Sequence, residues 1–398
     1  MTAAQSPTRA IERVYVLAGE PSGDAHAAKV IQKALQAQPE LQFRGMGGDE
    51  MAAQNVGLVE HISNTSIMGF LEVFAKLGFL WSLFRRVKAD ILAFKPDRIL
   101  LVDYPGFNLR LAKWARKQGI PVDMYISPQV WAWKKHRVHQ IARDIDRLSV
   151  ILPFEPKSYE GLDIEVEYVG HPLVEPSPNL SASQNALGTE VSTAGEDAPE
   201  AQEEAHSVSW RKAHGLPNSV PILALLPGSR PQEILRMLPV LEQTAQAFPD
   251  HCAVVAGAPG RTPADYATSL PVLFGSTQAL YARADVGVVT SGTATLEAAL
   301  AGLPQVVAYQ TSGFTYRIAK AFSRVKYISL VNLILDREAV PERIQEACSP
   351  SVLASTLKEV MSAEGRAQQK ADQAMLRAAL SKEGASQRVA KALLRPVG

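Results

Sequence analysis

The 398-residue sequence contains little cysteine and almost no net charge. Its two cysteines, Cys252 and Cys348, are too few for a disulfide framework or a thiolate zinc site, which is typical of a reducing compartment. A formal net charge of +1 provides no field for non-specific binding to nucleic acid. We therefore expect a cytoplasmic protein with neither a metal site nor a nucleic-acid partner.

The sequence also lacks an apolar run long enough for a membrane span. The residues before the first expected strand, near Arg13, are polar and small and show no signal-peptide core, so we do not expect export. The most apolar stretch, residues 68–84, is short and contains Glu72 and Lys76. With 46% hydrophobic and 20% charged residues, the chain is globular in composition, and its length suits two domains.

A strand, a glycine loop and a helix follow one another in ILALLPGSR at residues 222–230. The apolar residues have strand length and end at Pro227. Gly228 and Ser229 form the loop, and Arg230 opens a region of helical spacing. Backbone N–H groups at such a junction favour a phosphate, and Arg230 adds a permanent cation. The alternative is an ordinary turn with a solvated arginine.

The N-terminus repeats this arrangement. Residues 13–18 have the pattern of a buried strand, residues 19–24 form a loop with the sequence GEPSGD, and a helix is expected from Ala25. In parallel α/β sheets, such loops lie at the carboxyl edge, where ligands bind. The sequence therefore predicts an α/β protein in which two Rossmann-like doubly wound domains face a cleft.

A change of composition marks the boundary between the two halves. Residues 176–207 contain few large apolar residues and cannot bury a core, so we predict a disordered interdomain insertion. It separates an N-terminal domain at 1–175 from a C-terminal domain at 208–380. Residues 381–398 contain an amphipathic helix that is placed to pack back on the N-terminal domain.

Asp103 ends the apolar strand at 98–102. An aspartate at the carboxyl end of a central strand points into the expected cleft, where it is suited to act as a general base. The alternative is an aspartate that caps the next helix. The glycines at 45–48 do not follow the first strand, as a dinucleotide fingerprint requires, so we expect no NAD and no other cofactor. They would instead allow the close approach of a ligand or a neighbouring strand.

Small polar residues and a carboxylate follow the expected strand at 286–289. Ser291, Gly292 and Thr293 open a helix, and Glu297 lies one turn further on. This pattern suits a diphosphate bound by backbone N–H groups and a ribose bound by the carboxylate. The alternative is a helix that is merely well capped.

The apolar stretch at 68–84 is followed by the basic residues Arg85, Arg86 and Lys88. Within it, Phe79 and Leu83 widen the apolar surface beyond what contact with a core requires. A wide apolar face with a basic end suits a helix that lies in the membrane interface or lines a channel for acyl chains. The alternative is a buried core helix.

A series of motifs along the chain resembles the lipid-A-disaccharide synthase family. The motifs are AGEPSGD at 18–24, MGFLEV at 68–73, VDYPGFN at 102–108, SPQVWAW at 127–133, LLPGSR at 225–230, SGTATLE at 291–297 and SLVNL at 329–333. The resemblance covers nearly the whole chain, although the insertion at 176–207 is longer than the family's usual connection. It implies an inverting glycosyltransferase of GT-B architecture that needs no metal.

The implied reaction joins UDP-2,3-diacylglucosamine to 2,3-diacylglucosamine 1-phosphate, releasing UDP and forming the β(1→6) disaccharide precursor of lipid A. Asp103 matches the family's catalytic carboxylate, and Arg230 with the loop at 291–297 would hold UDP. Glu297 and Asn332 match positions that contact the nucleotide in the family.

The resemblance also assigns the acceptor and its lipid to the domain at 1–175 and the UDP-sugar to the domain at 208–380. It places Ser22 and Asp24 at the first loop, facing the cleft. It implies peripheral association with the inner leaflet of the inner membrane through the helix at 68–88, and it leaves open whether the chain forms a homodimer. Two other classes of protein remain. A UDP-N-acetylglucosamine 2-epimerase would share the architecture but act on water-soluble sugars, and a non-catalytic lipid-binding protein would have no need of Asp103 opposite a phosphate site.

Overall fold

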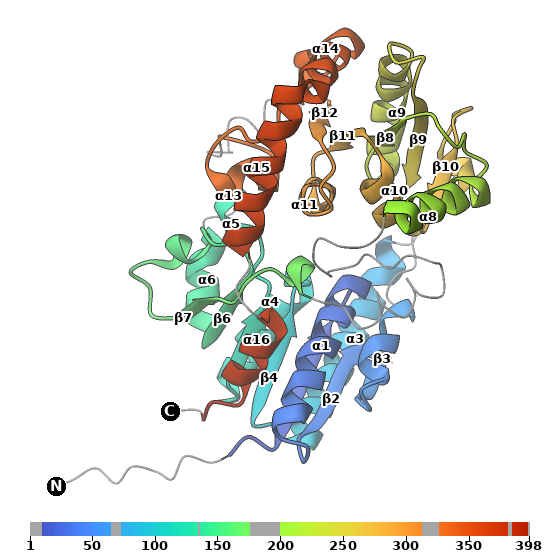
Figure 1. The fold of residues 1–398 in the computed structure, drawn as a ribbon. Helices are drawn as coiled ribbons and strands as arrows, with labels where there is room; N and C mark the ends of the chain where they lie inside the picture. The colour runs from blue at the N-terminus through green and yellow to red at the C-terminus, as the bar shows by residue number, and fades with distance from the viewer. Residues whose placement is uncertain are drawn as a thin grey trace, which may run out of the picture. The chain divides into compact units, whose positions relative to one another are not determined.

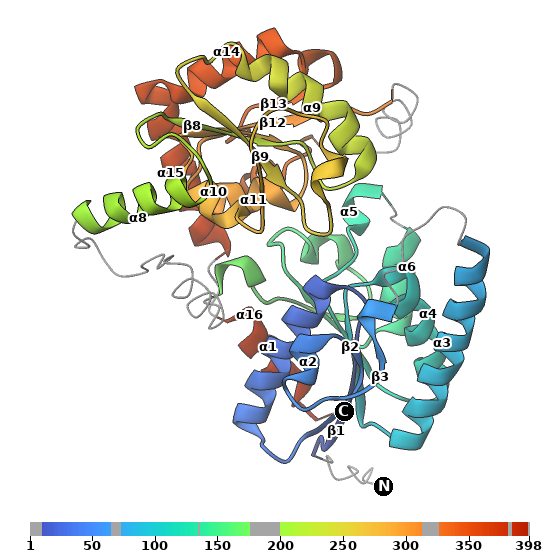
Figure 2. The ribbon, with the colours of Figure 1, turned by 90° about the vertical axis from the view of Figure 1, so that its right-hand side faces the viewer.

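The protein is described by a computed structural model over residues 10–64, 73–133, 136–175, 200–312, 326–380 and 384–396. The chain divides into two compact units, which we call the N-unit (Met1–Glu175 with Leu380–Gly398) and the C-unit (Pro176–Ala379). Each unit contains one parallel sheet with helices on both faces (Figures 1 and 2). Each is therefore a doubly wound α/β domain.

The sheet of the N-unit has seven strands in the order β3-β2-β1-β4-β5-β6-β7. All its strand pairs are parallel. The strand order reverses direction between β1 and β4, and the carboxyl edge at such a point is where ligands bind in this fold class. The strands are β1 (Arg13–Ala18), β2 (Gln42–Gly47), β3 (Gly57–His61), β4 (Arg98–Val102), β5 (Val122–Tyr125), β6 (Arg147–Val150) and β7 (Glu165–Tyr168).

Two layers of helices bury the faces of this sheet. Helices α1 and α16 pack on one face, and α3, α4 and α6 pack on the other. The helices of the N-unit are α1 (Pro21–Ala37), α2 (Asp49–Ala52), α3 (Val73–Phe94), α4 (Pro105–Lys117), α5 (Val130–Trp133), α6 (His136–Asp144) and α16 (Ala385–Leu393).

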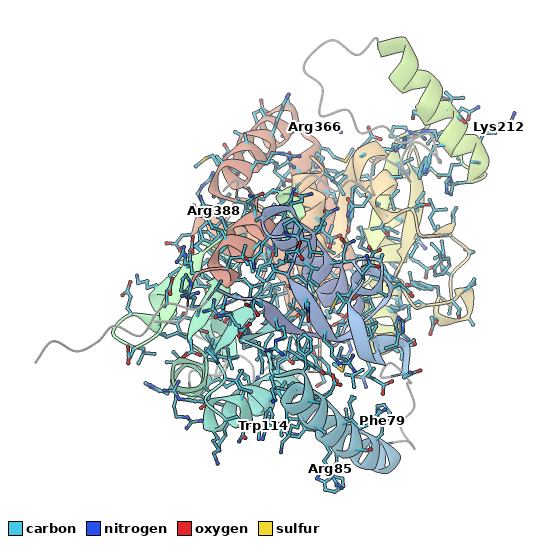
Figure 3. The ribbon with its side chains drawn as sticks, turned by 90° about the horizontal axis from the view of Figure 1, so that it is seen from below. Phe79, Arg85, Trp114, Lys212, Arg366 and Arg388 are labelled. Carbon is cyan, nitrogen blue, oxygen red and sulfur yellow. The ribbon has the colours of Figure 1, made fainter. Side chains whose placement is uncertain are left out.

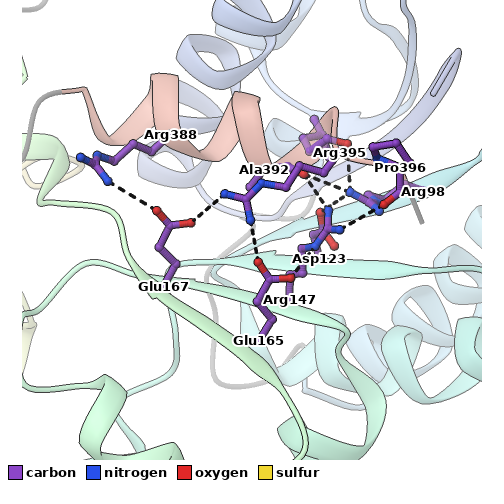
Figure 4. A network of polar contacts seen from close by, with 10 residues as sticks. Arg98, Asp123, Arg147, Glu165, Glu167, Arg388, Ala392, Arg395 and Pro396 are labelled. Atoms are coloured by element: carbon purple, nitrogen blue, oxygen red, sulfur yellow. Dashed lines mark hydrogen bonds and ion pairs between the residues drawn. The ribbon is translucent and has the colours of Figure 1, made fainter. Parts of the chain in front are cut away.

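The C-terminal helix α16 lies beside α1 in the N-unit, and two arginines hold its end (Figures 1 and 4). Arg98 Nη1 donates to the carbonyl oxygens of Ala392 at 3.2 Å and Leu393 at 3.0 Å, and Arg147 Nη1 donates to Ala392 O at 2.7 Å. Arg98 also pairs with Asp123 at 3.1 Å. These bonds satisfy carbonyl groups that a helix C-terminus otherwise leaves without partners.

The sheet of the C-unit has six strands in the order β10-β9-β8-β11-β12-β13, all paired in parallel. Its order reverses direction between β8 and β11. The strands are β8 (Ile222–Leu226), β9 (Cys252–Gly257), β10 (Val272–Phe274), β11 (Val286–Thr290), β12 (Gln305–Tyr309) and β13 (Glu342–Ile344). The helices are α8 (Glu200–Ala213), α9 (Pro231–Ala245), α10 (Thr277–Arg283), α11 (Thr293–Leu300), α13 (Leu330–Leu335), α14 (Pro350–Met361) and α15 (Ala363–Leu380).

The predicted insertion at 176–207 is wrong at its C-terminal end. Residues 200–207 form the first part of α8, and the glutamates and alanines of this segment are good helix formers. Residues 176–199 lie outside the described residues.

The predicted exposed face at 68–84 is wrong for Leu83. Residues 68–72 lie outside the described residues, and the rest of the stretch belongs to α3. Leu83 is only 1% exposed and lines the core with Val87 and Ile91, because residues spaced by four lie on the same side of a helix. Arg86, which we expected at the basic end of a membrane-contacting helix, pairs with Glu60. None of the helices within the described ranges combines the length and apolarity that a membrane span requires.

Candidate functional site

Asp103 lies directly after β4, next to the point where the strand order of the N-unit reverses. Its backbone N–H donates to Tyr125 O at 3.0 Å and extends the pairing of β4 with β5. Asp103 and Tyr104 both have left-handed backbone, with φ of 47° and 48°, which is uncommon for residues other than glycine. Asn108 Nδ2 donates to Asp103 O at 2.7 Å, so α4 holds this turn in place.

A second carboxylate, Glu20, follows the neighbouring strand β1, which pairs directly with β4. Burial and, to a smaller extent, the negative charge of Glu20 raise the pKa of Asp103, while the Tyr104 backbone N–H opposes them. A carboxyl group with a raised pKa is a better proton acceptor once ionised. Glu20 was missing from the predicted site. It could have been found from the sequence, because it lies in the loop directly after β1, the strand that pairs with β4.

Ser22 and Asp24 lie in the first turn of α1, which begins at Pro21 and not at Ala25. Ser22 is exposed. The prediction that Asp24 faces a cleft is wrong, because its side chain is buried inside the N-unit, with the residue only 3% exposed.

The carboxylate of Asp24 accepts hydrogen bonds from the backbone N–H groups of Gly48 at 2.7 Å, Glu50 at 3.0 Å and Met51 at 3.2 Å. It thus caps the N-terminus of α2. A Cβ atom at Gly48 would lie 2.6 Å from Asp24 Oδ2, which explains this glycine.

The backbone N–H groups of the loop before α9 already donate to a carboxylate in the first turn of that helix. Glu233 Oε2 accepts hydrogen bonds from the backbone N–H groups of Ser229 and Arg230, both at 3.2 Å. Gly228 is required here, because its φ is 103° and a Cβ atom would lie 2.7 Å from Glu233 Oε2. The prediction that these N–H groups are free for a phosphate is therefore wrong.

The cation of this loop remains available. The side chain of Arg230 is 80% exposed, although its Nη1 lies 3.1 Å from Glu233 Oε1. A second arginine, Arg261, donates from Nε to Ser229 O at 3.1 Å, and the sequence gave no sign of it. The positive charge at this edge therefore comes from side chains.

The loop at 291–293 differs from the α9 loop, because no side chain among the described residues accepts hydrogen bonds from its backbone N–H groups. We call it open in this sense. Gly292 is the N-cap residue of α11, and no side chain within the described ranges caps this helix, so the alternative of a helix capped by neighbouring hydroxyls does not apply there. Ser291 Oγ instead donates to Ile328 O at 3.0 Å, and Thr293 is exposed. The buried hydroxyl of Thr290, just before the loop, has no hydrogen-bond partner among the described residues. The N–H groups at the start of α11 can therefore receive an anion.

Glu297 lies one turn into α11, as predicted. It accepts a hydrogen bond from Gln278 Nε2 at 3.1 Å, and burial raises its pKa.

Asn332 lies in α13 and not in a loop, with 0% exposure. Its Nδ2 donates to Val340 O at 2.8 Å and to Glu342 Oε1 at 2.9 Å. Its Oδ1 accepts from the N–H groups of Ala339 at 2.7 Å and Val340 at 2.9 Å. Because an amide side chain offers two donors and two acceptors, Asn332 has no capacity left for a nucleotide.

The structure brings most candidates of the C-unit to one sheet edge. Strands β8 and β11 are neighbours, with Leu226 opposite Val289, so Arg230 and the loop at 291–293 follow adjacent strands. Asp103, Glu20 and Ser22 form a corresponding group in the N-unit. Within the described residues, no cluster of three or more His, Cys, Asp or Glu side chains could hold a metal ion.

Two doubly wound parallel-sheet units in one chain, each with polar loops at its switch point, are the architecture of the GT-B fold. The solved UDP-GlcNAc 2-epimerase from Neisseria meningitidis, bound to UDP-GlcNAc, is similar in fold with a TM-score of 0.66 over 96% of this chain and 99% of that chain. Its sequence identity is 12%, so this similarity shows the fold alone.

The sequence comparisons identify the family. The family model described as lipid-A-disaccharide synthetase matches residues 14–193 and 197–395. Lipid-A-disaccharide synthase 1 of Legionella pneumophila is 36% identical over 349 residues, 85% of each chain. The lipid-A-disaccharide synthase of Geobacter metallireducens is 34% identical over 400 residues, 97% of this chain and 98% of that protein. The chain belongs to the lipid-A-disaccharide synthase family, which confirms the resemblance of its motifs.

Proposed function

We propose that this protein transfers the diacylglucosamine of UDP-2,3-diacylglucosamine to 2,3-diacylglucosamine 1-phosphate, forming the β(1→6) disaccharide of lipid A and UDP. Family membership supports this reaction. The observation that carries the mechanism is the pair of Asp103 and Glu20 on adjacent strands of the N-unit.

Asp103 is the proposed general base. Its carboxylate takes the proton of the acceptor's 6-hydroxyl as the oxygen attacks the anomeric carbon of the donor, and the bond to UDP breaks with its electron pair on the diphosphate. Because burial and Glu20 raise the pKa of Asp103, its ionised form binds this proton more strongly than an ordinary carboxylate does. Ser22, exposed beside this pair, is the proposed polar contact to a substrate.

The C-unit is the proposed site of UDP. The open N-terminus of α11, with Ser291, Gly292 and Thr293, would bind the diphosphate. Glu297 would accept hydrogen bonds from the ribose. Arg230 would neutralise the negative charge that develops on the leaving diphosphate. This charge is stabilised without a metal in the scheme.

The neighbouring residues have supporting roles in this scheme. Gly228 and Ser229 shape the loop that presents Arg230. Asn332, with all its hydrogen bonds made inside the C-unit, supports the site and does not contact the nucleotide.

We propose that the protein works in the cytoplasm at the inner leaflet of the inner membrane, with α3 as its contact. Trp81 is 63% exposed, and the guanidinium of Arg85 lies 4.7 Å from its ring centroid. Figure 3 shows Arg85 pointing outward from α3. Lys88 lies 5.1 Å from the ring centroid of Trp114 on α4. An exposed aromatic ring flanked by cations suits the surface of an anionic membrane.

The substitution Asp103→Asn tests the base. Asparagine tolerates the left-handed backbone at this position, whereas alanine would add strain. We expect a loss of turnover of about 100- to 10,000-fold, the usual contribution of a general base, with UDP affinity unchanged. Measurement of UDP release with the acylated sugar phosphate, and of UDP binding by calorimetry, checks both expectations.

Asp336→Asn is the matched control, because Asp336 is also left-handed, with a φ of 52°, but is exposed at the end of α13. Turnover of Asp103→Asn within threefold of the control would rule out the base. Turnover of UDP-N-acetylglucosamine without an acylated acceptor would instead indicate an epimerase.

A further inference from the structure

Helix α15 buries polar side chains where a helix normally buries apolar ones. Gln369, Asp372 and Gln373 all lie on its inner face and are nearly inaccessible to solvent. Burial of such groups is unfavourable unless each finds a partner. Their partners outside α15 are Leu303 and Gln305, which follow α11, and Arg337, which follows α13.

The first contact runs through the start of β12. Gln369 Oε1 accepts a hydrogen bond from Gln305 N at 2.8 Å, and Gln369 Nε2 donates to Gln305 O at 2.8 Å. The side chain of Gln305 in turn donates from Nε2 to Thr295 O at 2.8 Å. Thr295 Oγ1 donates to Gly292 O at 2.8 Å. A continuous path of hydrogen bonds therefore leads from α15 to the N-cap of α11.

The same helix holds the other end of α11 and the segment after α13. Arg377 donates to Leu300 O and caps the last turn of α11. Asp372 pairs with Arg337, whose backbone N–H donates to Asn332 O at 3.2 Å. Helix α11 and the segment after α13 are thus both fixed to α15.

We infer that α15, acting through Gln369 and Gln305, holds the loop at 291–293 in the conformation that receives the donor's diphosphate. Gln305 and Gln369 are then positioning residues for the reaction, since neither touches the substrate. This inference rests on the proposed function for the identity of the ligand. The path of hydrogen bonds itself does not depend on that function.

The stability of the fold alone does not explain a glutamine at position 305. Its Oε1 is buried without a hydrogen-bond partner among the described residues. Thr295 O lies inside α11, where helix geometry already supplies it with a donor four residues on. A leucine of similar volume would remove the unpaired oxygen at little cost to folding. The bond from Gln305 to Thr295 O therefore serves the geometry of the loop.

The test compares Gln305→Leu with Gln373→Leu. Gln373 is a matched control, because it is also buried and donates one hydrogen bond, to Leu303 O at 3.1 Å, but it is not part of the path to Gly292. Three quantities are measured for each variant: the melting temperature, hydrogen exchange of the peptide covering 291–300 in the free protein, and affinity for UDP by calorimetry.

We expect the two variants to melt at similar temperatures. Gln305→Leu alone should exchange faster at 291–300 and bind UDP about 5- to 10-fold more weakly, the effect of one lost hydrogen bond. The KM for the donor should rise by the same factor while the KM for the acceptor stays constant. If Gln305→Leu does not fold, Gln305→Met removes the same donor with a more adaptable side chain.

Equal exchange and equal UDP affinity in both variants would overturn the inference. If the wild-type protein does not bind UDP, the proposed function fails. In that case the exchange measurement still decides whether Gln305 holds the loop, so the two failures are distinguishable.

Discussion

The proposed membrane contact predicts that replacing two nearby apolar residues of α3 affects two different properties of the protein. Leu83 is 1% exposed and belongs to the core of the N-unit, whereas Trp81 is 63% exposed. We therefore expect Leu83→Ala to affect folding and Trp81→Ala to affect membrane binding. The experiment separates the buried side of the helix from its proposed docking side.

The expected loss of stability follows from burial. Removal of a buried leucine side chain costs about 2–5 kcal/mol, because the cavity collapses only partly. For a unit of this size, each kcal/mol lowers the melting temperature by about 2–4 °C, so Leu83→Ala should melt roughly 4–20 °C lower. Trp81→Ala should lose no more than about 1 kcal/mol, mainly its exposed cation–π contact with Arg85.

The assay for docking is sedimentation with vesicles of neutral and anionic phospholipid. A double variant, Trp81→Ala with Arg85→Ala, should partition to anionic vesicles at least about 5-fold more weakly, because each arginine near such a surface contributes about 1 kcal/mol. Leu83→Ala, measured below its melting temperature, should bind like wild type.

Leu235→Ala provides the control for an exposed apolar residue, since Leu235 is 78% exposed on α9 of the C-unit. Undiminished binding by the double variant, or binding reduced equally by Leu235→Ala, would refute the assignment of docking to α3. A Leu83→Ala protein as stable as wild type would show that this side of α3 is not core.

Two further predictions concern the reaction. Arg230→Ala should weaken UDP binding and lower turnover together, by roughly 10- to 100-fold, the effect of one hydrogen bond to a charged group; unchanged UDP affinity in calorimetry would leave this arginine a solvated loop residue. Glu20→Gln removes a negative charge that raises the pKa of Asp103, so this pKa should fall and the acidic limb of kcat/KM should move to lower pH. A pH–rate profile with an unmoved or upward-shifted limb would contradict the pairing.

The loops at the sheet edges could be predicted because their signals are local. A strand such as 222–226 is a short apolar run that ends at proline and glycine, and both properties are visible in a few residues. The same holds for Asp103 after β4 and for the loop after β11. In a parallel sheet these carboxyl ends share one edge, so the positions of the candidate residues follow from the fold class.

The orientation of α3 could not be predicted in the same way. Apolar residues occur nearly all round the stretch at 68–84, so several stripes fit the helical period equally well. Packing against the sheet selects one of them, with Leu83, Val87 and Ile91 inward and Trp81 outward.

The roles of the buried polar residues could not be predicted from the local sequence either. Asp24 binds backbone groups at 48–51, and Asn332 binds groups at 339–342, each from another segment of the chain. A polar residue beside a functional loop has the same local sequence whether it faces a ligand or satisfies a neighbouring backbone. Only the partner decides, and the partner is set by tertiary structure.

A comparison of the N-termini of α9 and α11 favours α11 as the proposed binding site of the diphosphate. At α9 the carboxylate of Glu233 already accepts the loop N–H groups, and its charge would repel a diphosphate placed there. At α11 no side chain in the described part of the chain caps the helix, so its N–H groups offer the better anion site. Arg230 is 80% exposed while paired with Glu233, and such an exposed ion pair is weak. Its guanidinium can therefore exchange that partner for a phosphate oxygen as UDP leaves.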